Sequence, residues 1–301
     1  MLTGYAHPEY ARSLAEFGDP RELPRCGGWI LERQIPDFPF KDGMGCYPLF
    51  SCQDWSQLHI DIEELKNDLI SLVLVTDPFG DYDLAYLQRC FDFVKPFKEH
   101  FVADLNLQRE DIVSKHHRKC VRRSKKRVTV ERCDSPADFV DEWSRLYDFL
   151  KCRHDISGIQ AFSKKSFSRQ LSVPGTLLFR VLHEGAAVGA NLLYIQADVA
   201  YGHLSAFDPQ GYNLYAPYAV KWAILDFLFG KVRWFDIGAV AGSDSDGQDG
   251  LSKFKQGWST GTRTAYLCGR IFDKVKYLEI AKAKGIPKNK YFPAYRYGEF
   301  K

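Results

Sequence analysis

Buried strands and helices alternate in the first half of the chain. The apolar run at 69–76 predicts a strand covered on both faces, and 100–105 predicts a second one. Between them, apolar residues at three- and four-residue spacings predict a helix over 83–95. A basic helix at 108–126 and a strand at 128–130 follow. Strands and helices in alternation indicate an α/β layer.

The second half begins with a helix and continues with a run of strands. Residues 135–138 supply a serine, a proline and an acid in the order that typically starts a helix. A nearly all-apolar segment at 216–229 predicts a helix buried against a sheet, and 232–237 predicts a further strand. Between these lie one short helical segment and three strand-like runs: 163–171, 176–183, 187–196 and 198–206.

The length of the chain indicates two domains. Its 301 residues exceed the length that one hydrophobic core usually stabilises, since single cores stop growing near ~250–300 residues. We expect an N-terminal domain at 1–132 and a C-terminal domain at 133–301. Scattered proline and glycine predict irregular or short-strand structure in residues 1–60. The aromatic segment 291–297 is expected to be a strap that packs on the domains.

Charge is concentrated in one segment. The formal net charge of +3 is modest, so no overall basic field argues for nucleic acid. The stretch 115–127, however, contains eight Lys or Arg residues and two His residues. On a helix, Arg118, Arg122 and Lys126 follow one another at four-residue spacing and form a cationic stripe that could hold phosphates. A solvated helix face is the alternative interpretation.

Several features point away from metal sites, disulfides and membrane spans. The eight cysteines form no C-x-x-C pair, and we expect them to be reduced and mostly buried. The most apolar stretch, 214–229, is interrupted by Lys221 and Asp226, and the start of the chain has no leader-like pattern. The acidic stretch 242–250 does not have the residue order of an EF-hand. We therefore expect a cytoplasmic protein that uses no metal.

One short motif places an aromatic residue and a lysine side by side after a strand. Residues 250–258 read Gly-Leu-Ser-Lys-Phe-Lys-Gln-Gly-Trp. They follow an apolar segment that ends in Asp-Ile-Gly at 236–238, and a glycine-rich loop separates the two. A lysine just past a buried strand places a cation at the end of a sheet, where ligands of α/β folds often bind.

This order of strand, Asp-x-Gly, glycine-rich loop and Gly-Leu-x-x-Phe-Lys-x-Gly-aromatic resembles the second half of FemAB-like transferases. These are tandem-domain members of the GNAT acyltransferase superfamily. A second stretch, 114–133, resembles the basic helix and strand that close their first domain, so the resemblance covers about residues 70–270. It implies an α/β (α+β) fold of two tandem GNAT-like domains, each a mixed sheet flanked by helices. It also implies transfer of an acyl or aminoacyl group to an amine.

The resemblance further implies roles for individual residues. Direct attack by an amine, without a covalent enzyme intermediate, needs a stabilised oxyanion and a base for the amine proton. Lys255 is expected to stabilise the oxyanion, and Phe254 to brace that lysine. His203 or Asp236 is expected to handle the proton. A structural role for His203 and a loop-capping role for Asp236 remain the alternatives.

The strand predicted at 198–206 contributes further polar side chains. Side chains alternate along a strand, so Tyr201, His203 and Ser205 are expected to share one face. In GNAT enzymes this strand borders the acyl donor. Tyr201 and Ser205 are therefore candidate substrate contacts, together with the cationic stripe.

The choice of donor depends on the start of the apolar helix. GNAT enzymes seat the coenzyme A pyrophosphate at this position, which makes Gly211, Tyr212 and Asn213 candidate donor contacts. The superfamily's usual Gln/Arg-x-x-Gly-x-Gly/Ala loop is absent, as in FemAB-like proteins, and this departure puts coenzyme A in doubt. The favoured function is transfer of an acyl group from acyl-CoA to a small-molecule or peptide amine. The alternatives are an aminoacyl-tRNA-dependent aminoacyltransferase of the FemAB type and a non-catalytic binding or scaffold protein.

Overall fold

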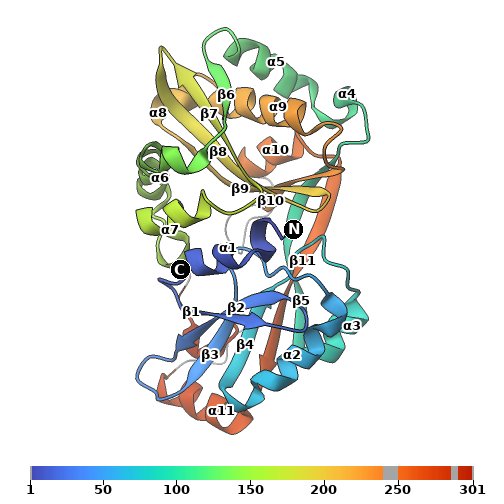
Figure 1. Ribbon diagram of the computed structural model, residues 1–301, viewed down its shortest axis with the longest axis vertical. Coiled ribbons are helices and arrows are strands. Elements are labelled where there is room, and N and C mark those ends of the chain that lie inside the picture. Colours follow the sequence, from blue (N-terminus) through green and yellow to red (C-terminus); the bar gives the residue numbers. More distant parts are fainter. Residues whose placement is uncertain (1, 240–249, 286–290, 300–301) are drawn as a thin grey trace. The chain divides into compact units, whose positions relative to one another are not determined.

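A computed structural model describes residues 2–239, 250–285 and 291–299, so most of the acidic stretch 242–250 lies outside the described residues. Its packing divides the chain into two compact units, each a mixed α/β layer (Figure 1). Unit 1 comprises Met1–Gly4, Lys98–Ile156 and Ala161–Arg263. Unit 2 comprises Tyr5–Phe97, Ser157–Gln160 and Thr264–Lys301.

The sheet of unit 1 has the strand order β5-β10-β9-β8-β7-β6. Its neighbours are antiparallel except for β9 and β10, which run parallel. The strands are β5 (Phe93–Asp104), β6 (Thr129–Cys133), β7 (Thr176–His183), β8 (Ala186–Gln196), β9 (Val199–Phe207) and β10 (Trp234–Ala239).

Helices cover both faces of this sheet. The apolar helix α9 packs on one face in a core that includes Val181, Leu193 and Phe235. On the other face, Tyr194 of β8 donates a hydrogen bond to the carbonyl of Gln170 in α7 (3.2 Å). The helices are α4 (Arg109–Ile112), α5 (Lys115–Ser124), α6 (Val140–His154), α7 (Lys164–Gln170), α8 (Pro209–Asn213), α9 (Ala216–Leu228) and α10 (Gly250–Gln256).

Unit 2 has a smaller sheet with the order β1-β2-β3-β4-β11. The strands are β1 (Asp19–Leu23), β2 (Gly28–Gln34), β3 (Lys41–Gly45), β4 (Leu69–Val75) and β11 (Gly261–Ile271). The helices are α1 (Pro8–Ser13), α2 (Leu58–Glu64), α3 (Leu84–Cys90) and α11 (Lys274–Ala283). One core packs α2 and α3 on β2 and β4, and a second packs α11 on Ile70 of β4 and on Ile35, which directly follows β2. Short 3-10 turns lie at 4–6, 55–57, 65–67, 136–139, 158–160 and 294–296.

The two sheets end in the same arrangement of parallel and antiparallel strands. Each is completed by a strand from the other part of the chain. In unit 2, β4 is parallel to β3 and β11 is antiparallel to β4. In unit 1, β10 is parallel to β9 and β5 is antiparallel to β10. Residues 100–104 of β5 thus complete the later sheet, and 267–271 of β11 complete the earlier one. The predicted pair of mixed sheets flanked by helices is confirmed, whereas the predicted boundary between residues 132 and 133 falls inside unit 1.

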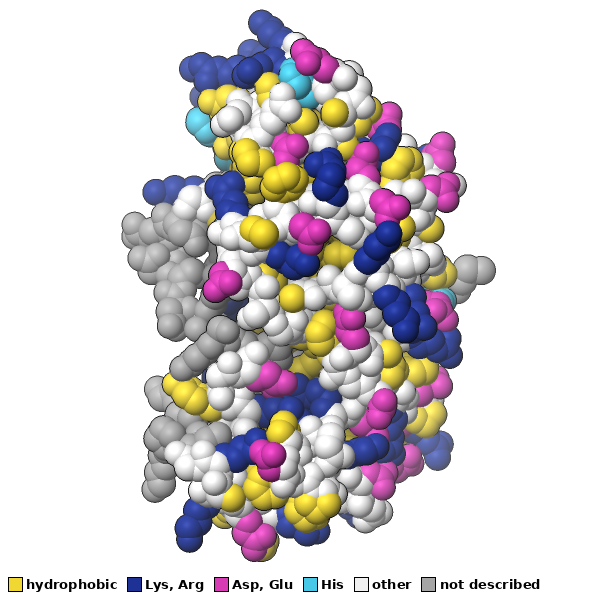
Figure 2. All heavy atoms as spheres, turned by 90° about the vertical axis from the view of Figure 1, so that its left-hand side faces the viewer, with side chains coloured by type: hydrophobic (Ala, Val, Ile, Leu, Met, Phe, Trp, Pro, Cys, Tyr) yellow, Lys and Arg dark blue, Asp and Glu magenta, His cyan; other side chains and the backbone are white. Residues whose placement is uncertain are grey.

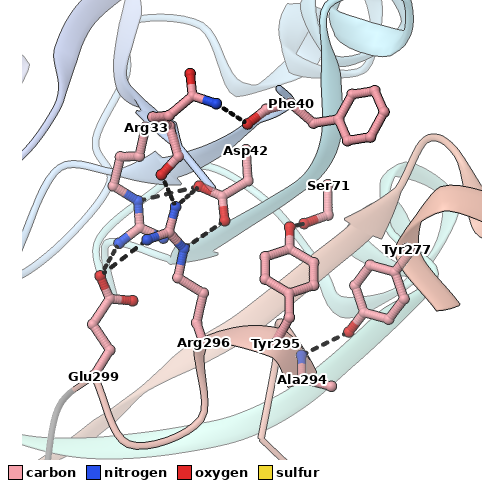
Figure 3. A network of polar contacts seen from close by, with 10 residues as sticks. Arg33, Phe40, Asp42, Ser71, Tyr277, Ala294, Tyr295, Arg296 and Glu299 are labelled. Atoms are coloured by element: carbon pink, nitrogen blue, oxygen red, sulfur yellow. Dashed lines mark hydrogen bonds and ion pairs between the residues drawn. The ribbon is translucent and has the colours of Figure 1, made fainter. Parts of the chain in front are cut away.

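A buried charge network fastens the C-terminal segment within unit 2 (Figure 3). The carboxylate of Asp42 accepts two hydrogen bonds from Arg296, at 2.8 and 2.9 Å, and Arg33 forms a second ion pair with it at 3.3 Å. Arg33 also donates to Glu299 at 2.7 Å. Beside this network the Tyr295 hydroxyl lies 2.8 Å from that of Ser71. The segment therefore packs by matched charges as well as by its aromatic rings.

Two predicted helices differ from the structure, and two elements were not predicted. The helix expected at 83–95 ends at Cys90, because Phe91 is extended and β5 begins two residues later. The basic helix expected at 108–126 is two helices, since Val113 is extended and the Ser114 hydroxyl caps α5 by accepting from the His117 amide. Neither β11 nor α11 was predicted, because β11 mixes polar and apolar residues and its partner β4 lies far earlier in the chain.

Candidate active site

A buried carboxylate and an imidazole meet at the end of β10 in unit 1. His100 of β5 donates from Nδ1 to Asp236 at 2.8 Å, and Asp236 also accepts the backbone N–H of Gly238 at 2.7 Å. The register between β10 and β5 shifts between Asp236 and Gly238, where a bulge bends the strand. Asp236 therefore orients a histidine and also caps its own loop, which is the alternative role considered for it from the sequence.

Lys255 reaches the same strand end from α10. Its amine donates to the carbonyl of Ala239, the last residue of β10. Gly238 has φ +90°, and a side chain there would place its first carbon 3.3 Å from that amine. Glycine thus permits both the backbone conformation and the close approach of the lysine. The motif lysine and the strand aspartate belong to one site, as their order in the sequence implied.

Phe254 belongs to a group of rings that joins α10 to α5 and α9. Its ring centroid lies 5.1 Å from that of Tyr218 and 5.6 Å from that of His117. His117 also donates from Nε2 to the Phe254 carbonyl at 3.0 Å. Burial lowers the pKa of His117, so it stays neutral and suits this structural hydrogen bond. These contacts fix the helix that carries Lys255.

Lys221 is a buried ionisable residue whose position sequence reasoning missed. It lies on the buried face of α9 with only 5% of its surface exposed. Burial, and then the charge of Lys255, lower its pKa from 10.5 to about 7, while Asp236 acts in the opposite direction. The one signal in the sequence is a lysine inside an otherwise apolar helix.

His203 contacts α7 and β8. Its Nε2 is 3.1 Å from the side-chain oxygen of Gln170, and its ring packs 5.0 Å from that of Tyr194. Burial lowers the pKa of His203 to about 3, so the imidazole is neutral and a weak base. These partners belong to α7 and β8, and they fit the structural role that the sequence left open.

The prediction that Tyr201, His203 and Ser205 share one face is wrong. Leu192 pairs with Leu204 but Leu193 pairs with Gly202, so His203 is the extra residue of a β-bulge. The bulge shifts the alternation of side chains along β9. Tyr201 is buried on the face of its partner Tyr194, whereas exposed Ser205 lies on the opposite face and accepts from Asn191 at 2.9 Å.

The structure brings part of the predicted cationic stripe together. Figure 2 shows Lys and Arg side chains gathered at the top of the view, where Figure 1 places α5. Four of them line an open depression of about 390 Å³: Lys119, Arg122, Arg123 and Lys126. Arg118 instead donates to the carbonyl of Glu110 at 3.0 Å. Arg122 and Lys126 are thus brought together, and Arg118 is held by the backbone.

The predicted donor contacts lie on α8, a separate short helix before the apolar helix α9, and the chain itself caps the start of α8. The Asp208 carboxylate accepts the Gly211 N–H at 2.7 Å, which places a negative charge at the first turn of α8. The Tyr212 ring stacks under the guanidinium of Arg153 at 4.2 Å, and Asn213 is exposed. An anion at Gly211 would meet this carboxylate, so the geometry does not favour a pyrophosphate there.

Neither a metal cluster nor a spanning helix was found in the described parts of the chain. Within residues 2–239, 250–285 and 291–299, no group of three His, Cys, Asp or Glu side chains could hold a metal ion. In the same ranges, each helix is too short or too polar to cross a bilayer.

Three solved structures share this fold over most of their length. FemX gives a TM-score of 0.65 at 13% identity, covering 90% of this chain and 93% of FemX. The C-terminal domain of a protein assigned as a lysylphosphatidylglycerol synthetase from Agrobacterium fabrum gives 0.65 at 14%, covering 93% of each chain. L-PGS from Bacillus licheniformis gives 0.58 at 14%, covering 95% and 97%. No protein-family model matches the sequence, and comparison with curated proteins found no match. At these identities the likeness establishes the fold alone, and the predicted resemblance to the FemX fold is confirmed.

Proposed function

We propose that the protein is an N-acyltransferase that moves an activated acyl group from acyl-CoA to an acceptor amine by direct attack. The observation that carries this proposal is the cluster at the end of β10, where Lys255 lies beside the Asp236–His100 pair. A cation and an oriented acid–base pair are what direct aminolysis requires. The acceptor is a small-molecule or peptide amine.

In this reaction the amine nitrogen attacks the acyl carbon and forms the new C–N bond. The carbonyl oxygen takes up negative charge, which the Lys255 ammonium stabilises. The C–S bond of the donor then breaks, and the leaving thiolate takes one proton from the amine. Asp236, oriented by His100, is better suited than His203 to pass the other proton, because the pKa of His203 is lowered to about 3 by burial.

Aminoacyl-tRNA is the second candidate donor, and the cationic depression of α5 favours it. Four Lys and Arg side chains line this depression, whereas Asp208 already occupies the helix start at Gly211. Phosphate groups of RNA would displace counterions at such a surface. The depression would then hold the tRNA backbone, while the β10 cluster performs the same attack on an ester instead of a thioester. A non-catalytic scaffold is the third candidate.

Binding across a salt series distinguishes the donors. If tRNA is the donor, its affinity should fall steeply with salt, and the double variant Arg122→Gln/Lys126→Gln should reduce the log–log slope by about 2. Lys231→Gln, an exposed lysine elsewhere in unit 1, is the matched control. Filter binding of tRNA and calorimetry with coenzyme A make the comparison. An unchanged slope in the double variant argues against this surface, and no binding of either donor favours the scaffold.

Lys255→Ala should lower kcat by about 100-fold or more with little change in melting temperature. One donor aimed at a developing oxyanion is worth about 10²–10³ in rate, and it acts mainly in the transition state. Lys253→Ala removes an exposed lysine from the same helix and should leave kcat unchanged. Steady-state acyl transfer of the three proteins is the measurement. Equal rates for both variants would remove Lys255 from the mechanism.

A further inference from the structure

His100 uses its two ring nitrogens differently. The residue lies on β5 with 7% of its surface exposed, and its Nδ1 is 2.8 Å from Oδ2 and 3.1 Å from Oδ1 of Asp236. An ionised carboxylate only accepts hydrogen bonds, so the proton in this contact is on Nδ1. Within the part of the chain that the structure describes, Nε2 makes no hydrogen bond. In the neutral ring this second nitrogen therefore carries a lone pair.

The contacts of Asp236 suit a residue that orients a base. Its side chain is buried, and its Oδ1 also accepts the Gly238 N–H at 2.7 Å. Both of its oxygens are thus engaged with groups of the protein itself. A buried carboxylate that accepts from one imidazole nitrogen fixes the ring and stabilises its charged form, while the other nitrogen exchanges the proton.

The backbone of β10 connects His100 to Lys255. In the register of β10 and β5, His100 pairs with Ala239, and the carbonyl of Ala239 accepts a hydrogen bond from the Lys255 amine. Gly238, which donates to Asp236, is also the position where an added side chain would place its first carbon 3.3 Å from that amine. Two consecutive residues of β10 therefore contact both the cation and the oriented pair, so the imidazole and the proposed oxyanion site belong to one strand end.

We propose that His100 is the base of this reaction, and that its Nε2 takes the proton that the acceptor ammonium must lose before it attacks the acyl carbon. This inference rests on the proposed amine acylation. In the step, an N–H bond of the acceptor ammonium breaks and its electron pair stays on nitrogen, while the proton binds the lone pair of Nε2. Net charge is conserved, and Asp236 stabilises the imidazolium through Nδ1. The neutral amine then attacks, and His100 releases its proton to water after the product leaves.

Two other histidines of unit 1 are held by structural contacts. His117 uses both ring nitrogens, since Nδ1 is 2.7 Å from the Ser114 hydroxyl and Nε2 donates to the Phe254 carbonyl at 3.0 Å. His203 has its Nε2 at 3.1 Å from the side-chain oxygen of Gln170. His100 differs from both, because its one hydrogen-bonded nitrogen contacts a carboxylate of the proposed site.

Asparagine at position 100 separates the roles of the two nitrogens. Its amide N–H takes the place of Nδ1 and can still donate to Asp236, but asparagine has no atom in place of Nε2. With acetyl-CoA or an aminoacyl-tRNA as donor and ethylamine, an ammonium at pH 7, as acceptor, His100→Asn should lose about 100-fold or more in kcat. His154→Asn, which changes an exposed histidine of unit 1, should keep the wild-type rate. If His100→Asn were as fast as the wild type, the ring would only orient Asp236, and the proposal would be overturned.

A neutral acceptor separates loss of a base from damage to the site. Hydroxylamine is already neutral at pH 7, so His100→Asn should lose at most about threefold with this acceptor. Equal losses with both amines would overturn this proposal while leaving the proposed function intact. If the wild type transfers from neither donor to either amine, the proposed function itself fails, and the inference fails with it.

Nitrogen NMR of the wild-type protein with labelled histidine tests the same assignment without an assay of activity. The neutral ring of His100 should carry its proton on Nδ1 and none on Nε2. A neutral ring protonated on Nε2 would have no lone pair to offer the acceptor, and this result would overturn the proposal even if His100→Asn did not fold.

Discussion

Replacing Asp42 with alanine is expected to lower the free energy of unfolding of unit 2 by about 3–5 kcal/mol. Asp42 is fully buried and is the shared partner of Arg33 and Arg296, which are themselves buried within the network. Without this carboxylate, two guanidinium groups remain desolvated and lose their main countercharge. Among the residues that the structure describes, Glu299 is the acid that would still pair with them. Urea denaturation followed by fluorescence measures the change.

Asp68→Ala is the matched control for that variant. Asp68 also pairs with an arginine of unit 2, Arg21, but its side chain is 53% exposed. Exposed pairs contribute about 0–1 kcal/mol, so this variant should unfold almost like the wild type. If both variants lost the same free energy of unfolding, burial would not explain the contribution of the Asp42 network to stability.

Lys221→Met is expected to remove a dependence of stability on pH. The pKa of Lys221 is about 7 in the folded protein and 10.5 as its ordinary value. Between these values the unfolded chain holds more protons at this residue than the folded one, so raising the pH stabilises the fold. The wild type should gain about 1.4 kcal/mol per pH unit relative to the variant between pH 7 and 9. Below pH 7 the variant should be the more stable protein, because it buries no charge.

Urea unfolding of both proteins at pH 6, 7, 8 and 9 gives the difference directly. Comparing wild type and variant cancels the titration of the tyrosines and cysteines that they share. Lys231→Met, in which an exposed lysine is lost, should follow the wild type at every pH. Parallel curves for wild type and Lys221→Met would mean that this lysine keeps an ordinary pKa in the folded state.

Local patterns predicted the fold where contacts are close in sequence. The strands at 69–75, 176–183 and 199–207 and the helix at 216–228 follow apolar runs that any buried element requires. The bulge at His203 could not be predicted, because a register shift depends on the partner strand. It reversed the face of Ser205 relative to Tyr201, which a strict alternation had placed together.

The candidate site was predicted only in part, and for a similar reason. Asp236 and Lys255 follow each other closely in the chain, and their order was enough to place them together. His100 is 136 residues from its partner Asp236, and it reaches the site only because β5 crosses into the later sheet. The lowered pKa of Lys221 could not be predicted from the sequence, because it depends on how deeply the residue is buried and which charges lie near it.

The exchanged strands have a consequence for biosynthesis. A chain leaves the ribosome from its N-terminus, so residues 5–97 emerge long before 267–271, which supply the strand beside β4. Until residues 267–271 have been made, β4 has an unpaired edge, and such edges pair readily with other chains. A later part of the chain is thus needed to protect an earlier part. Loss of the C-terminal segment, by early termination or proteolysis, would expose a sheet edge nearly 200 residues away from the cut.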